Sequence, residues 1–270
     1  MLLGAVTASA PEPVTVVTDA RYIQVASRLL GVKKALPWPQ GSDPLPTGRR
    51  IDLQGSLRGW GRPMAARVRK RSLRRRLRLV SGWVKPRPSV PEIYAEACGW
   101  SPASAPWFPD AGLERDRLVL IPGASTRIKQ WRASGWEKVG RQWDGPVWVI
   151  GGPGEEDLVS RICARIPDSQ GLCENGFGKT LEVLEGCRVA VGGDTGLMHL
   201  AGAMGAHVVA LFGPTAPEDG FFVYPGEVVE RSLICRPCTL HRRPRCWRGG
   251  SLCMDLDPDD VLAAVRRCTG

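Results

Sequence analysis

The second half of the chain alternates short apolar runs with longer amphipathic segments. Each run has the length and composition of a buried strand, and the segments between them place their apolar residues at helical spacing. Strand–helix alternation with apolar strands predicts parallel sheets covered by helices on both faces. The expected strands lie at residues 117–121, 146–152, 187–193 and 207–213, and the expected helices at residues 134–143, 155–166, 196–205 and 256–268.

A shorter series of the same kind occupies the first part of the chain. Val14–Thr18 has the pattern of a buried strand, Tyr22–Gly31 that of a helix ended by glycine, and residues 92–100 that of a second helix. A proline-rich stretch at Ser101–Pro109 suits a linker. A chain of 270 residues has room for two domains of moderate size. The sequence therefore predicts two doubly wound α/β domains.

Charge is distributed unevenly between these two parts. Residues 1–110 carry 18 Lys and Arg against 7 Asp and Glu, whereas residues 111–270 carry 19 against 20. The excess of positive charge lies entirely in the first part, which indicates two modules that face different partners.

Three loops of the second part follow expected strands and carry polar side chains. In open parallel sheets, ligands bind beyond the carboxyl ends of the strands. The loop after Ile121 offers Ser125 and Thr126 as hydroxyl donors and Lys129 as a cation, and the next loop offers Glu155 as an acceptor for ribose hydroxyls. In the third loop Thr195 and Gly196 begin a helix, whose free amides favour a phosphate. Together the three loops predict a site for a nucleoside diphosphate, although their glycines could also serve only tight turns.

Standard nucleotide-binding signatures are absent. No G-x-G-x-x-G follows a strand, and Gly176–Thr180 resembles the end of a P-loop whose required first glycine is replaced by Cys173. These departures argue against ATP hydrolysis and against dinucleotide redox chemistry.

Four segments together resemble a known family. "DTGLMHLAGAMGAHVVALFGPT", "PGASTRIKQW", "GGPGEE" and "DLQGSLRG" are similar to segments of the ADP-heptose:lipopolysaccharide heptosyltransferases of glycosyltransferase family 9, and the similarity runs from about Val14 to the last helix. The resemblance implies a GT-B-like α/β fold, with two Rossmann-like domains facing a cleft. It also implies transfer of a heptose from ADP-heptose to the lipopolysaccharide inner core, with inversion and with no metal required for catalysis.

The resemblance also implies a domain plan and roles for the loop residues. Residues 1–109 would form a truncated, basic acceptor-side domain, residues 110–256 the nucleotide-sugar domain, and residues 257–270 a helix that packs back on the N-terminal domain. The implied donor-site residues are Ser125, Thr126 and Lys129 for the diphosphate, Glu155 for the ribose, Thr195 and Gly196 for phosphate through their amides, Asp194 for sugar hydroxyls and His199 for the diphosphate side. The alternative role for His199 is purely structural, as a histidine within a helix whose ring forms a hydrogen bond with a backbone carbonyl.

One family feature has no counterpart in the sequence. Family members begin with a strand and a Gly-Asp loop whose aspartate is the presumed base, whereas this chain opens at what should be the following helix. The catalytic residue is therefore unassigned, because nothing matches the nearest carboxylates, Asp19 and Asp52, to that role. Three explanations stay open: a start upstream of Met1, a substitute carboxylate, or weak activity. The alternative function is a catalytically impaired homologue that binds nucleotide sugar or acidic glycolipid without turnover.

Residues 58–79 hold ten Lys and Arg and no acid. Such a run is either a solvated helix face or a surface for an anionic partner. In this family the partner would be the phosphorylated Kdo–lipid A acceptor and the anionic inner membrane. Nucleic acid, the rival partner, is disfavoured because no recognised binding module is present. The basic residues expected at this surface are Arg58, Arg69, Lys70, Arg71, Arg74 and Arg75.

The cysteines suggest a possible metal site. Nine cysteines in a chain without a convincing export signal argue against a disulfide framework. Cys235, Cys238, Cys246 and Cys253 have C-x₂-C-x₇-C-x₆-C spacing, which suits a structural zinc, a disulfide pair or free thiols. The expected location is the cytoplasm, with peripheral attachment to the inner face of the inner membrane, since no run of eighteen apolar residues is present.

Overall fold

The computed structural model describes residues 2–38, 47–49, 51–53, 66–67, 88–238 and 245–270. Contacts divide the chain into two compact units, here called the N-terminal unit (Leu2–Ser104) and the C-terminal unit (Ala105–Gly270). The division falls at residues 104 and 105, before the expected boundary at residues 109 and 110. The reason is that Trp107 and Phe108 are buried in the C-terminal unit, where the Trp107 amide donates to the Ala203 carbonyl.

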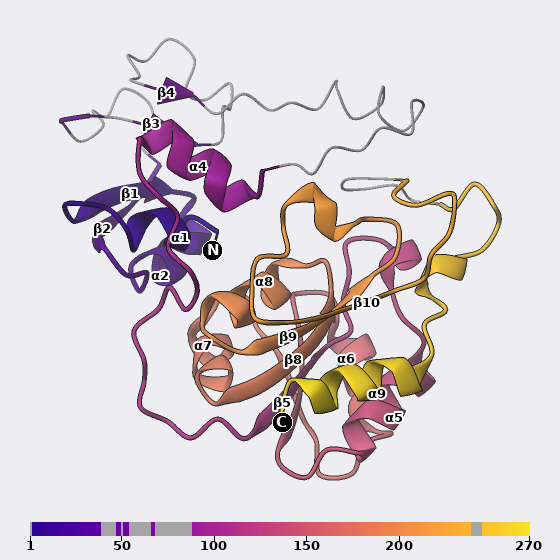
Figure 1. The fold of residues 1–270 in the computed structure, drawn as a ribbon. Coiled ribbons are helices and arrows are strands. Elements are labelled where there is room, and N and C mark those ends of the chain that lie inside the picture. Colours follow the sequence, from indigo (N-terminus) through magenta and orange to yellow (C-terminus); the bar gives the residue numbers. More distant parts are fainter. Residues whose placement is uncertain (1, 39–46, 50, 54–65, 68–87, 239–244) are drawn as a thin grey trace. The chain divides into compact units, whose positions relative to one another are not determined.

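The C-terminal unit is built on one parallel sheet of six strands (Figure 1). The order of the strands is β10-β9-β8-β5-β6-β7. The chain runs from β5 outward through β6 and β7, then crosses back to β8 and continues through β9 and β10. The order therefore reverses between β5 and β8, where Leu120 pairs with Val191. The strands are β5 (Arg117–Ile121), β6 (Val147–Gly151), β7 (Gln170–Cys173), β8 (Cys187–Gly193), β9 (His207–Phe212) and β10 (Gly226–Glu230).

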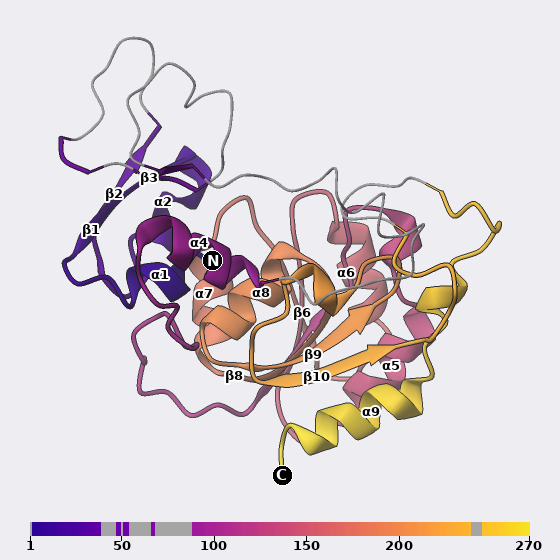
Figure 2. The ribbon, with the colours of Figure 1, turned by 45° about the horizontal axis from the view of Figure 1, so that its top comes forward.

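Helices cover both faces of this sheet, as the alternation of patterns predicts (Figures 1 and 2). One face packs against α5, α6 and α9, and the other lies under α7 and α8. The helices are α5 (Ala133–Arg141), α6 (Glu156–Cys163), α7 (Gly178–Glu185), α8 (Gly196–Ala203) and α9 (Pro258–Arg267), with 3₁₀ turns η3 (Arg127–Lys129), η4 (Pro217–Asp219) and η5 (Leu252–Met254).

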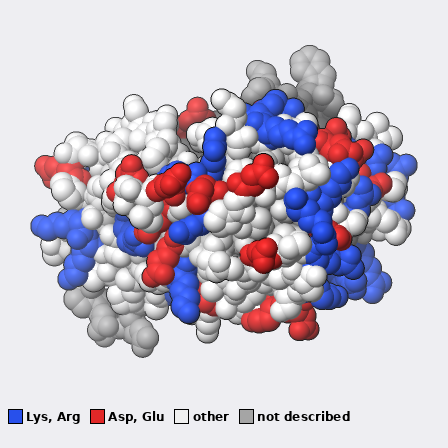
Figure 3. Space-filling view, turned by 90° about the horizontal axis from the view of Figure 1, so that it is seen from below, with Lys and Arg blue, Asp and Glu red and all other residues white. Residues whose placement is uncertain are grey.

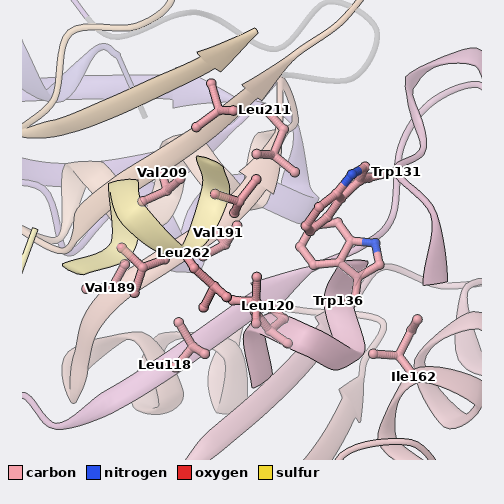
Figure 4. Close-up of a cluster of buried hydrophobic side chains, with 14 of the residues drawn as sticks. Leu118, Leu120, Trp131, Trp136, Ile162, Val189, Val191, Val209, Leu211 and Leu262 are labelled. Atoms are coloured by element: carbon pink, nitrogen blue, oxygen red, sulfur yellow. The ribbon is translucent and has the colours of Figure 1, made fainter. Parts of the chain in front are cut away.

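The core on the α5–α6–α9 face uses alternate strand residues (Figure 4). Leu118, Leu120, Val189 and Val191 point from β5 and β8 toward the helices, because successive side chains of a strand alternate between the faces. The rings of Trp131 and Trp136 meet edge to face, 5.0 Å apart between centroids, and the Trp131 indole donates to the Leu256 carbonyl.

The last helix, α9, contacts α5 and β10 of its own unit. The predicted packing of residues 257–270 on the N-terminal domain stays a prediction. Val261, Leu262, Ala264 and Val265 are buried there in the same core as Leu118 and Leu120. The amphipathic pattern of α9 predicts a buried stripe, but the stripe is equally compatible with either apolar partner.

The N-terminal unit contains two parallel strand pairs, β1 with β2 and β3 with β4. The expected helix at Tyr22–Gly31 is shorter than the pattern predicts, since only η1 and α2 are helical before the chain turns at Gly31. Gly31 has φ +76°, and a Cβ there would lie 1.8 Å from the Thr7 carbonyl oxygen. Its elements are α1 (Gly4–Thr7), β1 (Val14–Thr18), η1 (Ala20–Tyr22), α2 (Ile23–Ala26), β2 (Val32–Pro37), β3 (Ile51–Asp52), β4 (Ala66–Arg67) and α4 (Val90–Cys98).

Both ends of α4 are capped. Ser89 accepts from the Glu92 amide and the Glu92 carboxylate accepts from the Ser89 amide, so the two residues form a capping box. Gly99 ends the helix in the left-handed region with φ 73°. Both units are α/β with parallel strands, which confirms the predicted fold class.

Candidate functional site

Three polar loops meet at one edge of the six-stranded sheet. They follow β5, β6 and β8, which are adjacent strands, and the carboxyl ends of parallel strands lie at the same edge. Two of the loops flank the position between β5 and β8 where the strand order reverses. Ligands of doubly wound sheets bind in the crevice at such a position. The topology therefore brings the predicted loop residues together at the edge where sheets of this kind bind ligands.

Lys129, Asp194 and His199 form a buried cluster at this edge. Lys129 ends η3 after β5, Asp194 follows β8, and His199 lies one turn into α8. Lys129 Nζ is 3.2 Å from Asp194 Oδ2, and His199 Nε2 is 3.3 Å from Asp194 Oδ1. The three side chains are 6%, 12% and 11% exposed. One oxygen of the Asp194 carboxylate thus pairs with the lysine, and the other pairs with the histidine.

The ionised form of Asp194 is favoured in this cluster. Burial raises the pKa of this carboxyl, but the hydrogen bond with His199 and the charge of Lys129 outweigh burial and lower the pKa to about 2. Asp194 is therefore an anion across the physiological range. Its charge compensates the buried ammonium of Lys129, which would be costly to bury alone.

The free energy of unfolding of the protein should depend on the protonation of Asp194 at acid pH. Because the folded-state pKa of about 2 lies below the ordinary value of 3.8, the unfolded chain binds the proton more readily as the pH falls. The stabilisation is complete above about pH 4 and is lost between about pH 4 and pH 2, with a magnitude of about 2 kcal/mol. Urea unfolding of the protein and of Asp194→Asn across this range measures it. We expect the difference between the two free energies of unfolding to shrink toward acid, and a constant difference would contradict this account.

The N-terminus of α8 supplies amides beside the cluster. Thr195 is the N-cap, and its hydroxyl accepts from the Met198 amide at 3.4 Å. Gly196, the first residue of the helix, is exposed. The first amides of a helix have no intrahelical acceptor and carry the positive end of its dipole. This end of α8 can therefore bind an anion next to Lys129.

Two buried polar atoms at the site have no hydrogen-bond partner within the described part of the chain. They are Thr126 Oγ1, in the loop after β5, and His199 Nδ1. A buried polar group without a partner is costly, and such groups in native proteins are commonly satisfied by a ligand or a water molecule. Ser125, in the same loop, is exposed. The unpaired atoms fit a site that is completed by a polar ligand.

Glu155 connects the second loop to the first. Its Oε2 accepts from the Gly152 amide at 2.8 Å. The carboxylate lies directly over Gly123, where an added Cβ would be 2.1 Å from Oε2. The glycine is therefore needed for this approach, which places a carboxylate beside the loop that carries Thr126 and Lys129.

Sequence reasoning missed the aromatic side chains that support His199. The rings of Tyr224 and Phe221 lie 5.8 Å and 6.2 Å from the imidazole, and Trp107 lies 5.5 Å from Tyr224. The Tyr224 ring fits only because Gly202 of α8 has no side chain, since a Cβ there would be 2.4 Å from the ring. The aromatic run at residues 221–224 is the signal that could have found this support.

Arg236 is the second feature that sequence reasoning missed. Its guanidinium, 7% exposed, donates to the carbonyl oxygens of Gly213, Thr215 and Arg231 and pairs with Glu230 at 2.8 Å. One side chain thereby joins the loop after β9 to the end of β10. In the sequence this arginine stands between two cysteines, whose spacing is the more conspicuous pattern.

The remaining candidate residues are not brought into this site. Within the described residues, no group of three or more His, Cys, Asp or Glu side chains is arranged to hold a metal ion. Cys235, Cys238, Cys246 and Cys253 have free thiols, and burial raises the pKa of Cys253. The structural zinc stays a prediction. The predicted anionic-surface residues Arg58, Arg69, Lys70, Arg71, Arg74 and Arg75 lie outside the described residues.

No helix in the described part of the chain is long and apolar enough to cross a membrane.

The family comparison agrees with the motifs. Residues 93–223 match the model of glycosyltransferase family 9 (heptosyltransferase), a range that includes all three loops. Lipopolysaccharide heptosyltransferase 1 of Pseudomonas aeruginosa is 29% identical over 144 residues, which cover 48% of this chain and 41% of that protein. Lipooligosaccharide heptosyltransferase 2 of Campylobacter jejuni is 28% identical over 162 residues, 56% of this chain and 50% of that protein. The matched part spans about half the length of these relatives or less.

Solved structures share the fold. E. coli ADP-heptose lipopolysaccharide heptosyltransferase II superposes with a TM-score of 0.67 at 17% identity, over 99% of this chain and 94% of that one. The family 9 glycosyltransferase of Veillonella parvula gives a TM-score of 0.67 at 13% identity and the same coverage. The matched residues 93–223, just under half of the chain, carry the three neighbouring loops of the sheet, and they are similar to glycosyltransferase family 9.

Proposed function

We propose that the protein transfers a heptose from ADP-heptose to the inner core of lipopolysaccharide, with inversion at the transferred carbon and without a catalytic metal. The observation that carries this proposal is the buried Lys129–Asp194–His199 cluster beside the N-terminus of α8. It lies where a doubly wound sheet binds nucleotides, and the curated relatives that match part of this chain are heptosyltransferases.

The donor diphosphate would bind between Lys129 and the first amides of α8. As the glycosidic bond breaks, negative charge grows on the departing nucleoside diphosphate. A buried lysine and a helix N-terminus are already positioned to stabilise that charge, so they act without reorganisation. Ser125 and the unpaired hydroxyl of Thr126 would add hydrogen bonds to the phosphate oxygens. The positive charge that a metal supplies in other transferases would come from the chain itself.

The carboxylates would bind the neutral parts of the donor. Asp194 would accept hydrogen bonds from hydroxyls of the transferred sugar, and Glu155 from the ribose, where Glu155 Oε2 already accepts from Gly152. His199 donates to Asp194 in one tautomer, which leaves Nδ1 as an acceptor. The acceptor would be the Kdo–lipid A core, presented at the anionic inner face of the inner membrane to a cytoplasmic enzyme. We assign no catalytic base.

A transfer assay tests this function. The protein is incubated with ADP-heptose and a Kdo–lipid A acceptor, and the glycolipid is analysed by mass spectrometry, while calorimetry measures ADP binding. We expect ADP to bind and one heptose to be added. ADP binding without transfer would instead support the impaired homologue that holds nucleotide sugar without turnover. Absence of ADP binding would contradict both the transferase and the impaired homologue. Salt-sensitive binding of duplex DNA without ADP binding would favour a nucleic-acid-binding protein.

A further inference from the structure

Arg236 is a buried arginine. Lys and Arg side chains lie at many points of the surface in Figure 3, whereas the Arg236 side chain is 7% exposed. Burying a guanidinium is costly unless its N–H groups are bonded. The N–H groups of Arg236 donate to backbone carbonyl oxygens and to one carboxylate, and these bonds compensate its burial.

The backbone that follows β9 is buried. Gly213, Pro214 and Thr215 are all buried, so their carbonyl oxygens need hydrogen-bond donors within the protein. Arg236 Nε donates to the Gly213 carbonyl, and Arg236 Nη2 donates to the Thr215 carbonyl at 3.2 Å. The Cys238 amide donates to the Pro214 carbonyl at 3.0 Å. Three consecutive carbonyl oxygens are thus held from one short segment.

The same guanidinium bonds to the end of β10. Arg236 Nη1 donates to the Arg231 carbonyl at 2.6 Å, and Nη2 pairs with Glu230 Oε2 at 2.8 Å. Residues 213–225, which we call the β9–β10 loop, lie between the two strands. Arg236 therefore ties the start of this loop to the carboxyl end of the next strand. A lysine cannot make the same set of bonds, because only the planar guanidinium presents several N–H donors in a fixed fork.

The far part of the β9–β10 loop packs against the candidate site. The rings of Phe221 and Tyr224 lie 6.2 Å and 5.8 Å from the His199 imidazole, between centroids. Nε2 of His199 is 3.3 Å from Asp194 Oδ1, and Nδ1 has no hydrogen-bond partner within the described residues. One hydrogen bond and these two rings therefore support the imidazole.

We propose that Arg236 is a positioning residue for the donor sugar. It holds the start of the β9–β10 loop, the aromatic rings of that loop support His199, and His199 orients the Asp194 carboxylate. The proposal rests on the proposed function, in which Asp194 accepts hydrogen bonds from hydroxyls of the transferred sugar. Arg236 acts without touching the donor, because a displacement of about 1 Å at a reacting group can lower a rate about a hundredfold.

Arg236→Lys tests the role of the guanidinium. The lysine keeps the positive charge beside Glu230 but cannot bond to the carbonyl oxygens of Gly213, Thr215 and Arg231 together. We expect kcat/KM for ADP-heptose to fall about tenfold or more in the transfer assay, because the sugar is misplaced. The affinity for ADP, measured by calorimetry, should stay nearly the same, because ADP lacks the transferred sugar. Unchanged turnover, or equal losses of turnover and of ADP affinity, would overturn the proposal.

Two further variants accompany this test. Arg267→Lys is the matched control, because Arg267 pairs with Glu227 of β10 at 3.2 Å on the surface, and this variant should leave turnover unchanged. Phe221→Leu removes one supporting ring and leaves the buried arginine in place. It should lower kcat/KM for ADP-heptose in the same selective way, and it provides the test if Arg236→Lys does not fold. Unchanged turnover in Phe221→Leu would contradict the role of the loop.

Nuclear magnetic resonance of His199 tests the proposal without a transfer assay. In Arg236→Lys the imidazole nitrogen signals of His199 should shift, whereas those of His207, at the start of β9, should not. Unchanged His199 signals would overturn the proposal, as would equal shifts of both histidines, which indicate a disturbed fold. If the unchanged protein transfers no heptose and the His199 signals still shift in the variant, the result would contradict the proposed function but support the positioning of His199 by Arg236.

Discussion

Replacing Lys129 with methionine is expected to weaken ADP binding by about a hundredfold. The substitution keeps the length of the buried side chain and removes its charge, so the charge-assisted contact with the diphosphate is lost, at about 2–3 kcal/mol. Asp194 would also be left as a buried carboxylate with only His199 beside it, which adds repulsion toward the ligand. Isothermal titration calorimetry with ADP measures the change.

A matched control is Lys138→Met on α5. Lys138 is also paired with a carboxylate, at 2.6 Å from Asp259, but it is 43% exposed and belongs to a surface pair. This variant should bind ADP with unchanged affinity, since exposed ion pairs contribute little. An ADP affinity of Lys129→Met that equals that of the control would remove Lys129 from the site.

The second large effect is expected from Asp194→Asn. This substitution should affect the binding of ADP and the use of the complete donor, ADP-heptose, differently. In the structure Asp194 compensates Lys129, so removing its charge reduces repulsion toward a diphosphate, and ADP should bind as well as before or more tightly. The variant loses the carboxylate that accepts from the sugar hydroxyls. We therefore expect kcat/KM for ADP-heptose to fall about a hundredfold or more. Calorimetry with ADP and a transfer assay with ADP-heptose give the two readings.

Asp259→Asn, which removes the partner of Lys138, is the control for this variant and should change neither reading. Equal loss of ADP affinity and donor turnover in Asp194→Asn would show that Asp194 only shapes the turn after β8. Circular dichroism of the variant is needed beside both readings, because an unpaired buried lysine destabilises the fold.

Within the six-stranded sheet, the predicted strands that the structure confirms are those buried on both faces. The strands β5, β6, β8 and β9 are continuous apolar runs because helices cover both sides of the sheet, and such runs are recognisable without any partner. The two strands of the six-stranded sheet that sequence reasoning missed, β7 and β10, are its edges. Their sequences, "QGLC" and "GEVVE", are short and partly exposed, so neither carries a clear apolar pattern.

The placement of the three loops follows from order along the chain together with one rule of topology. Parallel strands joined by helices have their carboxyl ends at one edge, so the order of the elements alone places the loops after β5, β6 and β8 there. The partners within the site do not follow from that order. Asp194 lies sixty-five positions from Lys129 and has no pattern that marks it as the counter-ion. The same holds for the carboxylate of Glu155 over Gly123.

The sequence by itself determined the fold class, the resemblance to glycosyltransferase family 9 and the edge of the sheet where the three polar loops meet, because periodicity and local motifs are properties of neighbouring residues. Only the tertiary structure shows which side chains form ion pairs and which core each helix face packs against. It alone shows that Arg236 forms hydrogen bonds with the loop after β9. These are contacts between distant segments, whose energies depend on distance and burial. A stripe on α9 or an arginine between two cysteines is compatible with several partners until the chain is folded.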